Sequence, residues 1–293
     1  MAIKLITIDI DDTLVNTAKQ VTPRVKAALQ EATAQGVKVV LTTGRPLPGV
    51  QEYLDELGLN HQDDQYAITY NGGVVQTTNG EELGGKELAY SDYLRLREVA
   101  DELGAYLQVE TIDAAYTSAK EINYWASREN FLIKMPLIIK PVDEMDPNDH
   151  YVKFMFIGDE ADIDSWRDAL PADVKEAYYI VKSTPQHLEF MHKDATKGSG
   201  LLTLAAKLGI DRSETMALGD QQNDVTMIEA AGLGVAMGNA VPEVKAVADV
   251  ETTTQNADGV GVAVEKWVLG RDVPELAEFA KNNICRNGWN IVR

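Results

Sequence analysis

The segment Ile3–Ile10 most narrowly limits what this chain can fold into. It is a nearly continuous apolar run, rich in β-branched residues, and it leads straight into the acidic residues Asp11 and Asp12. A strand that is apolar at successive positions is covered on both faces, as in a parallel sheet between two layers of helices. The segment therefore predicts an α/β sheet with polar side chains at the C-terminal end of a buried strand.

Helices and strands alternate after this segment. Thr22 and Pro23 are typical of a helix N-cap and first helical position, and Gly36 is typical of a helix end. A strand at 37–41, a helix at 50–57 and a strand at 66–70 follow. This order predicts a doubly wound parallel sheet. After Phe190 the same order returns, with helices expected at 201–208, 224–231 and 259–269 and strands at 215–218 and 233–237.

The alternation is interrupted between the two halves. Asn71-Gly72-Gly73 and Asn79-Gly80 are turn signals that flank 74–77, as in a hairpin. Helical patterns and alternating strands are then mixed in one long segment. We therefore expect a Rossmann-like doubly wound core with an inserted α+β cap domain of the C2 type. The core would comprise residues 1–82 and 189–270, and the cap residues 83–188. A C-terminal tail, residues 271–293, would follow, with one or two helical turns around 274–281.

Charge excludes several classes of partner. With 27 basic and 46 acidic residues, the formal net charge is −19. Such a chain repels nucleic acids and anionic membrane surfaces, so neither is an expected partner. The single cysteine, Cys285, permits no intramolecular disulfide and fits a reducing compartment. No apolar run reaches the roughly 20 residues of a membrane helix, and no signal peptide precedes the first aspartates. We expect a soluble, cytoplasmic protein.

Polar residues gather where the predicted parallel strands end, which is where such sheets bind ligands. Carboxylates at one point repel each other, and a divalent cation relieves that repulsion. All-oxygen ligands without histidine or cysteine select Mg²⁺. A lysine, a threonine hydroxyl and amide groups nearby can hold a phosphate group. The residues concerned are Asp9, Asp11, Thr43, Gly44, Lys197, Asp220, Asn223 and Asp224.

Four short motifs carry a family resemblance. They are Asp9-Ile10-Asp11-Asp12-Thr13, Thr43-Gly44-Arg45, Lys197-Gly198 and Gly219-Asp220-Gln221-Gln222-Asn223-Asp224. In order and spacing they resemble the motifs of the haloacid dehalogenase-like phosphatases. The long insertion and Asn71-Gly72-Gly73 resemble the Cof-type branch, and within it the YidA-type sugar phosphatases, over residues 1 to about 270.

The resemblance implies a role for each matching residue. Asp9 would be the nucleophile and a metal ligand, and Asp11 the general acid and base, with its backbone carbonyl on Mg²⁺. Asp220 and Asp224 would complete the metal site. Phosphate would be held by Ile10, Thr43, Gly44, Lys197 and Asn223, and substrate contacts are expected at Arg45, Asn71, Gly72, Tyr124 and Arg128. One position departs from the family: Asp12 stands where the family has glycine, and we expect its carboxylate to point outward.

Structural roles compete with several of these expectations. Lys197 is an unfavourable charge at a helix start unless an anion lies near it. Asn71-Gly72-Gly73 fits a plain hairpin turn equally well. Tyr124, Trp125 and Arg128 fit a helix that packs in a core. His187, His192 and Cys285 are expected to be structural.

The function that these features favour is a Mg²⁺-dependent phosphatase of small sugar phosphates, acting through an aspartyl-phosphate on Asp9. Two alternatives stay open. A phosphomutase would share the covalent intermediate, and a receiver-like signalling protein would share the aspartates, threonine and lysine around Mg²⁺. The expected partner is a small phosphate ester, and a homodimer is an expectation by analogy.

Overall fold

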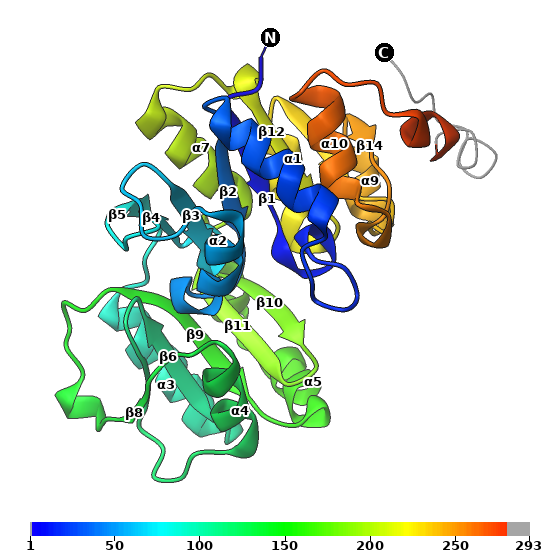
Figure 1. Ribbon diagram of the computed structural model, residues 1–293. Coiled ribbons are helices and arrows are strands. Elements are labelled where there is room, and N and C mark those ends of the chain that lie inside the picture. The colour runs from blue at the N-terminus through cyan, green and yellow to red at the C-terminus, as the bar shows by residue number, and fades with distance from the viewer. Residues whose placement is uncertain (1, 280–293) are drawn as a thin grey trace. The chain divides into compact units, whose positions relative to one another are not determined.

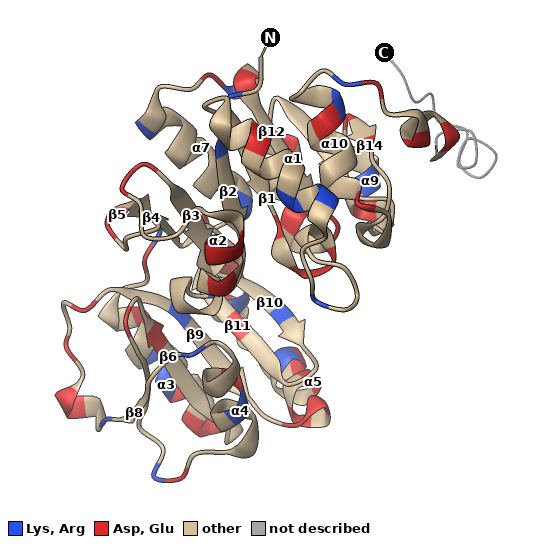
Figure 2. Ribbon diagram, viewed as in Figure 1, with Lys and Arg blue, Asp and Glu red and all other residues tan. Residues whose placement is uncertain are grey.

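The computed structural model describes residues 2–279, which divide into two compact units. The core unit consists of residues 2–44, 51–84 and 196–279, and the inserted unit consists of residues 45–50 and 85–195. Figure 2 shows acidic residues distributed over both units, in keeping with the large negative charge. None of the helices within 2–279 is long and apolar enough to cross a membrane.

An eight-stranded sheet forms the centre of the core unit. Its strands are β1 (Leu5–Ile8), β2 (Lys38–Thr42), β3 (Tyr66–Thr69), β4 (Val74–Thr77), β5 (Glu82–Gly85), β12 (Thr215–Gly219), β13 (Leu233–Ala236) and β14 (Val250–Glu251). Their order is β14-β13-β12-β1-β2-β3-β4-β5 (Figure 1). The strands from β14 to β3 are parallel, and β4 is antiparallel to β3. Leu5 of β1 lies opposite Lys38 on one side and Thr215 on the other.

Helices cover both faces of this sheet, and every residue of β1 and β12 is accordingly buried. The helices are α1 (Pro23–Ala34), α2 (Gln51–Leu57), α7 (Lys197–Leu208), α8 (Val225–Ala230), α9 (Pro242–Val247) and α10 (Gly259–Trp267). α1 contacts α2 and α10, whereas α7 contacts α8, which in turn contacts α9. Because crossovers between parallel strands are nearly always right-handed, the strand order places these two groups on opposite faces. The predicted doubly wound α/β fold is thereby confirmed.

The predicted start of α1 is also confirmed. Thr22 Oγ1 accepts a hydrogen bond of 3.4 Å from the Val25 N–H, and Pro23 occupies the first helical position. α9 and β14 were not predicted, because six and two residues are too few to show a periodic pattern. Residues 274–279 are helical, as expected. Residues 280–281 of that predicted turn, and Cys285, lie outside the described residues.

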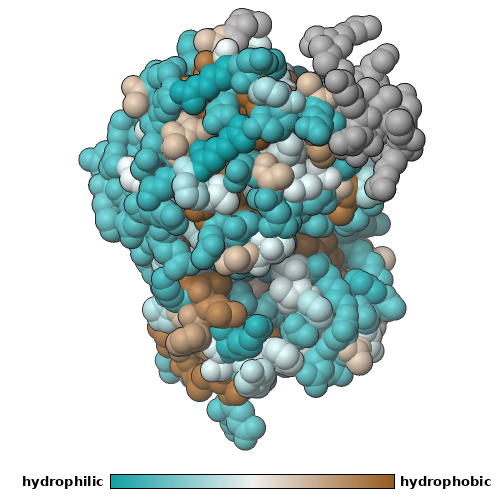
Figure 3. Space-filling model, turned by 45° about the vertical axis from the view of Figure 1, so that its right-hand side comes forward, coloured by the Kyte–Doolittle hydropathy of each residue, from teal (hydrophilic) through white to brown (hydrophobic). Residues whose placement is uncertain are grey.

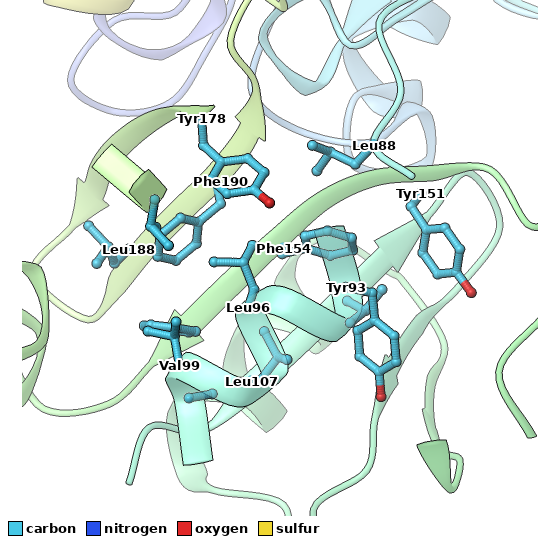
Figure 4. Close-up of a cluster of buried hydrophobic side chains, with 14 of the residues drawn as sticks. Leu88, Tyr93, Leu96, Val99, Leu107, Tyr151, Phe154, Tyr178, Leu188 and Phe190 are labelled. Atoms are coloured by element: carbon cyan, nitrogen blue, oxygen red, sulfur yellow. The ribbon is translucent and has the colours of Figure 1, made fainter. Parts of the chain in front are cut away.

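The inserted unit contains a six-stranded sheet in the order β10-β11-β9-β6-β7-β8, antiparallel except for β7 and β8. One face packs a hydrophobic cluster that includes Tyr93, Leu96, Phe154, Phe156 and Phe190 (Figure 4). The elements are β6 (Leu107–Thr111), β7 (Ala115–Thr117), β8 (Leu137–Ile139), β9 (Tyr151–Ile157), β10 (Tyr178–Thr184), β11 (His187–His192), α3 (Tyr90–Leu103), α4 (Tyr124–Leu132), α5 (Glu160–Ala169) and α6 (Ala172–Ala177).

The limits of the inserted unit differ from those expected. The expected boundary after residue 188 falls inside β11, which pairs with both β9 and β10, and the unit continues to Ala195. Residues 45–50, expected in the core, belong to the inserted unit. There a Cβ atom on Gly49 would lie 3.5 Å from the carbonyl oxygen of Ile133, at the end of α4. Sequence periodicity could not show this contact, because it joins segments more than eighty residues apart.

Candidate active site

Several of the predicted site residues lie at the ends of the three central strands of the core sheet, along one edge. β1 lies between β2 and β12, and all three are parallel. Asp9 follows β1, Thr43 follows β2 and Asp220 follows β12. Because the C-terminal ends of parallel strands meet at one edge, residues about two hundred positions apart become neighbours.

The chain leaves β1 in one short turn, Ile10–Leu14. The Leu14 N–H donates to the carbonyl of Asp9 at 3.1 Å, which fixes the start of this turn. Asp12 has φ 61° and ψ 15°, the left-handed region in which glycine is favoured and aspartate is tolerated better than most residues. This backbone conformation explains why a glycine is expected at this position from the resemblance and why an aspartate can replace it. Asp12 is partly exposed, as its expected outward orientation requires.

Three carboxylates and one ammonium group converge at this edge. Oxygen atoms of Asp9, Asp220 and Asp224 all lie within 4.8 Å of one another, and the three residues are buried. Lys197 Nζ lies 2.5 Å from Asp9 Oδ1 and 2.6 Å from Asp224 Oδ1. Lys197 is fully buried at the first position of α7, so the predicted need for a nearby anion at this helix start is met by these carboxylates.

Burial sets the electrostatics of this group. Burial raises the pKa of Asp9 to about 8, although the Lys197 ammonium pulls it down and Asp224 adds to the rise. Burial also raises the pKa of Asp220 to about 7, although the hydrogen bond from Thr13 lowers this pKa. Burial alone would lower the pKa of Lys197, but Asp224 and Asp9 outweigh it and hold that pKa above its ordinary value.

The donor set fits a magnesium ion. When all three buried carboxyl groups are ionised, the one buried ammonium leaves two negative charges without compensation, which a divalent cation would balance. The cluster offers only oxygen ligands, which Mg²⁺ prefers over nitrogen or sulfur. Its carboxylates belong to Asp9, Asp220 and Asp224. The carboxylate of Asp11, also predicted for the metal site, is not among them.

Asp11 instead directs its side chain toward solvent. Its carboxylate is 43% exposed and pairs with Lys19 Nζ at 3.0 Å. The expected contribution of Asp11 to a metal is its backbone carbonyl, so the pair with Lys19 does not contradict that role. An exposed ion pair of this kind is worth about 1 kcal/mol or less.

Two neighbours of Asp220 were given no role from the sequence, although Thr13 belongs to the first motif. Thr13 Oγ1 donates to Asp220 Oδ1 at 2.9 Å. Asn239 Nδ2 donates to the carbonyl of Asp12 at 2.8 Å and lies 3.4 Å from Asp220 Oδ2. Asn239 thus links the loop after β1 to the aspartate after β12. Its position just after the strand β13 is the signal that could have found it, since the other site residues occupy equivalent positions.

Asp224 holds the loop after β12. Its Oδ2 accepts hydrogen bonds from the backbone N–H groups of Asp220, at 2.9 Å, and Gln221, at 3.0 Å. A Cβ atom on Gly219 would lie 2.5 Å from the Asp224 side chain, so a side chain at 219 would displace this carboxylate. Asp224 therefore shapes the loop and places its other oxygen on Lys197.

The residues expected to hold phosphate are connected through Asn71. The Asn71 N–H donates to the Thr43 carbonyl at 2.8 Å, and Asn71 Oδ1 accepts from Asn223 Nδ2 at 3.1 Å. A Cβ atom on Gly44 would lie only 3.0 Å from Asn71 Nδ2. The turn at 71–73 is thus more than a hairpin connection, because it braces two of the loops at the site. Ile10 is fully buried, so only its backbone could meet a phosphate.

The remaining substrate expectations fall on the inserted unit. Arg45 Nη1 donates to the Gly49 carbonyl at 3.4 Å. Tyr124 is 70% exposed on α4, and Arg128 lies beside Trp125, 6.0 Å from the ring. The alternative that Tyr124 packs in a core is therefore wrong, whereas its expected contact with substrate stays a prediction. Figure 3 shows hydrophobic side chains gathered on part of one face. Exposed large hydrophobic residues of the inserted unit are Leu94, Ile122, Tyr124, Phe131, Leu132, Ile138 and Ile139.

Comparisons with known proteins agree with this geometry. A family model described as haloacid dehalogenase-like hydrolase matches residues 6–264. "Putative phosphatase YxeH" of Bacillus subtilis is 40% identical over 269 residues, covering 92% of this chain and 99% of its own. The 5-amino-6-(5-phospho-D-ribitylamino)uracil phosphatase YcsE of the same organism is 32% identical and covers 91% and 96%. A haloacid dehalogenase-like hydrolase from Bacteroides thetaiotaomicron superposes with a TM-score of 0.79 at 29% identity, covering 90% and 99%.

Proposed function

The chain belongs to the haloacid dehalogenase-like hydrolases and is a phosphatase of that family, and from this premise we propose that it hydrolyses small sugar phosphates with Mg²⁺ through a phosphorylated Asp9. One observation carries the proposal: Asp9, Asp220, Asp224 and Lys197 meet in a buried cluster at the C-terminal edge of the sheet. A nucleophile, a cation site and a fixed positive charge are what phosphoryl transfer requires.

The first half of the proposed reaction transfers the phosphoryl group to Asp9. A carboxylate oxygen of Asp9 attacks phosphorus, and the bond from phosphorus to the substrate oxygen breaks. Asp11, as the carboxylic acid, gives its proton to the departing oxygen, which leaves as an alcohol. Lys197, with hydrogen-bond donors from Thr43, Gly44 and Asn223, holds the phosphoryl oxygens.

The second half regenerates the enzyme. Asp11, now a carboxylate, takes a proton from water, whose oxygen attacks phosphorus and releases inorganic phosphate from Asp9. Asp9, Asp220, Asp224 and the backbone carbonyl of Asp11 would hold the metal. Mg²⁺, when bound, would neutralise the carboxylates and stabilise charge on the phosphoryl oxygens.

A phosphate ester of a hydroxyl-bearing chain is favoured by the relative YcsE, whose name places the phosphate on a ribityl chain. We assign the choice among such substrates to the inserted unit, because all four chemical motifs except Arg45 lie in the core unit. The proposed partner is thus a small phosphate ester. A homodimer and a cytoplasmic location stay predictions.

Phosphate release from a panel of sugar phosphates, nucleotides and p-nitrophenyl phosphate tests the proposal. We expect turnover with Mg²⁺, loss of turnover in EDTA, and recovery when Mg²⁺ is restored. Full turnover in EDTA would contradict the metal role. Transfer of phosphate between two positions of a sugar, without release, would favour the phosphomutase. A single stoichiometric phosphorylation would favour the receiver-like alternative, which the family match over 6–264 already disfavours.

A further inference from the structure

The turn that follows β3 has an unusual backbone. Tyr70, Asn71 and Gly72 are three consecutive residues with positive φ, at 51°, 54° and 96°. Left-handed backbone costs free energy in any residue with a Cβ atom, so Tyr70 and Asn71 are strained here. Both are buried, at 1% and 3% exposed. Strained residues persist where the surrounding structure holds them in place, and they cluster at functional sites.

Asn71 contacts three residues that the proposed reaction uses as phosphate donors. Its N–H donates to the carbonyl of Thr43 at 2.8 Å. A Cβ atom on Gly44 would lie 3.0 Å from Asn71 Nδ2, so the amide packs against this loop. Asn223 Nδ2 donates to Asn71 Oδ1 at 3.1 Å. Asn71 therefore joins the loop after β2 to the loop after β12.

The same turn lies against the helix that supplies the fourth donor, Lys197. A Cβ atom on Gly72 would lie 2.0 Å from the carbonyl oxygen of Thr196, and a Cβ atom on Gly200 would lie 3.2 Å from Gly72 Cα. Lys197 directly follows Thr196 at the start of α7. All these residues belong to the core unit. The turn thus has a fixed place beside every donor of the phosphate-holding group.

The hydrogen bond between the two asparagines sets the orientation of Asn223. An amide nitrogen carries two hydrogens, and Asn71 Oδ1 accepts one of those on Asn223 Nδ2. The second hydrogen is left to donate to a phosphoryl oxygen. Because Asn71 Oδ1 accepts and cannot donate, the Asn223 amide is held with its nitrogen at this end. The reversed amide would present its carbonyl oxygen, which an anionic phosphoryl group repels.

We propose that Asn71 is a positioning residue for phosphoryl transfer: it orients the Asn223 amide and holds the Thr43–Gly44 loop so that their donors meet one phosphoryl group. This inference rests on the proposed phosphatase function. A direct contact with the sugar, the role expected from the sequence, would make the effect of Asn71 depend on the sugar. Positioning of the phosphate donors makes its effect the same for every phosphate ester.

The variant Asn71→Gly separates these roles in the full-length, Mg²⁺-supplied protein. Glycine relieves the backbone strain, so the urea midpoint of unfolding should change little. We expect kcat/KM to fall at least about tenfold for a sugar phosphate, a nucleotide and p-nitrophenyl phosphate alike, with the three factors within about threefold of one another. The inhibition constant of inorganic phosphate should rise at least about fivefold, because the donors no longer converge.

Three outcomes would overturn the inference. A loss confined to the sugar phosphate would identify a contact with the sugar. A loss below threefold on every substrate would show that Asn71 has no part in the reaction. A lower urea midpoint with an unchanged inhibition constant of inorganic phosphate would show a structural role alone.

His61→Gly is the matched control. His61 has φ 53°, is exposed and lies in the core unit after α2. It should leave kcat/KM and the inhibition constant of inorganic phosphate unchanged. If His61→Gly lowered both as Asn71→Gly does, glycine at a left-handed position would be the cause, and the role of the Asn71 amide would be refuted.

A double variant tests the coupling between the two amides. In an Asn223→Ala background, Asn71→Gly should lower kcat/KM by a factor at least about threefold smaller than in the unaltered protein, because part of its effect passes through Asn223. Equal factors in the two backgrounds would overturn this coupling. Phosphate release by all four proteins, measured under the same conditions, gives the comparison.

If circular dichroism shows that Asn71→Gly does not fold, Asn71→Asp keeps the test open. Aspartate tolerates the left-handed backbone and still accepts from Asn223, but it adds a negative charge beside the donors. The inhibition constant of inorganic phosphate should then rise at least about tenfold, and an unchanged constant would overturn the inference. Absence of phosphate release from every substrate by the unaltered protein would instead overturn the proposed function, so the two failures are distinguishable.

Discussion

Lys197 supplies the positive charge that pairs with the buried carboxylates of the site. Its ammonium is fully buried between Asp9 and Asp224, and removing it leaves both carboxylates without their cation. For Lys197→Met we expect kcat/KM to fall about thirty- to a thousandfold, since one charge-assisted contact to the transition state is worth roughly 2–4 kcal/mol. Steady-state phosphate release measures this.

The same substitution should lower the stability of the metal-free protein by about 3–5 kcal/mol, because an unpaired buried charge remains. Thermal unfolding in EDTA checks this. Lys207→Met, an exposed position in the last turn of α7, is the control for the loss of a lysine from this helix. A loss of activity below threefold on every substrate would show that Lys197 has no part in phosphate binding.

Residues differ in how far the sequence reveals them. Asp9 and Asp220 were predictable as neighbours, because strand order alone brings strand ends together. Lys197 was singled out because it lies at the start of the helix that precedes β12. Asn239 and Thr13 were not, because their importance comes from hydrogen bonds to Asp220 that depend on side-chain geometry. The sequence also gave no sign that the Asp11 carboxylate would pair with Lys19 instead of joining the acidic cluster.

At the scale of elements, the turn at Gly72 fixes the start of helix α7. Gly72 has φ +96°, and a Cβ atom there would lie 2.0 Å from the carbonyl oxygen of Thr196, the N-cap of α7. Gly36 has a similar φ, +88°, with no atom within 4 Å of a Cβ. Both positions therefore have a backbone conformation that strains any residue with a side chain, and they differ in the steric contact that a side chain would make.

We expect Gly36→Ala to cost about 1–2 kcal/mol of stability, from the left-handed backbone alone. Gly72→Ala should cost about 1–3 kcal/mol more, because the overlap must be relieved by moving backbone. It should also lower kcat, since Lys197 follows Thr196 directly. Urea unfolding and phosphate release measure both effects. Equal stability and equal activity of the two variants would refute the proposed bracing of α7.

Helices and strands that are long enough to show a hydrophobic pattern were predictable, and the shortest ones were not. β1 and α1 carry clear patterns and caps, whereas α9 and β14 are too short to show a period. The boundary inside β11 was missed because its pairing with β9 and β10 is a tertiary contact. The same reason applies to residues 45–50, whose packing at the end of α4 leaves no trace in local sequence.

At the scale of the whole molecule, the buried acids link stability to pH and metal. In the metal-free protein the pKa of Asp9 is about 8 and that of Asp220 about 7, both raised by burial from 3.8. A carboxyl group with a raised folded-state pKa stabilises the folded state fully below its unfolded pKa. That stabilisation is lost as pH rises through the folded pKa. Metal-free stability should therefore fall between about pH 4 and pH 8.

Mg²⁺ must displace these protons to bind, so its stabilising effect should grow over the same range. Thermal unfolding with EDTA and with Mg²⁺, at about pH 5 and about pH 8, measures the difference. Asp220→Asn removes one of the two titrating groups. It should therefore weaken the pH dependence of the metal-free stability and the pH dependence of the Mg²⁺ effect. A Mg²⁺ effect that is larger at the lower pH would refute the linkage.

The central claim is that Asp9 carries the phosphoryl group and Asp11 the proton, and quenched mass spectrometry tests it most directly. With an activated aryl phosphate, whose departing oxygen needs little protonation, Asp11→Asn should still be phosphorylated but should hydrolyse the adduct slowly. We predict a phosphate adduct on Asp9 in the Asp11→Asn protein and no adduct in Asp9→Asn. An adduct on Asp11 or Asp12, or one that persists in Asp9→Asn, would contradict the account.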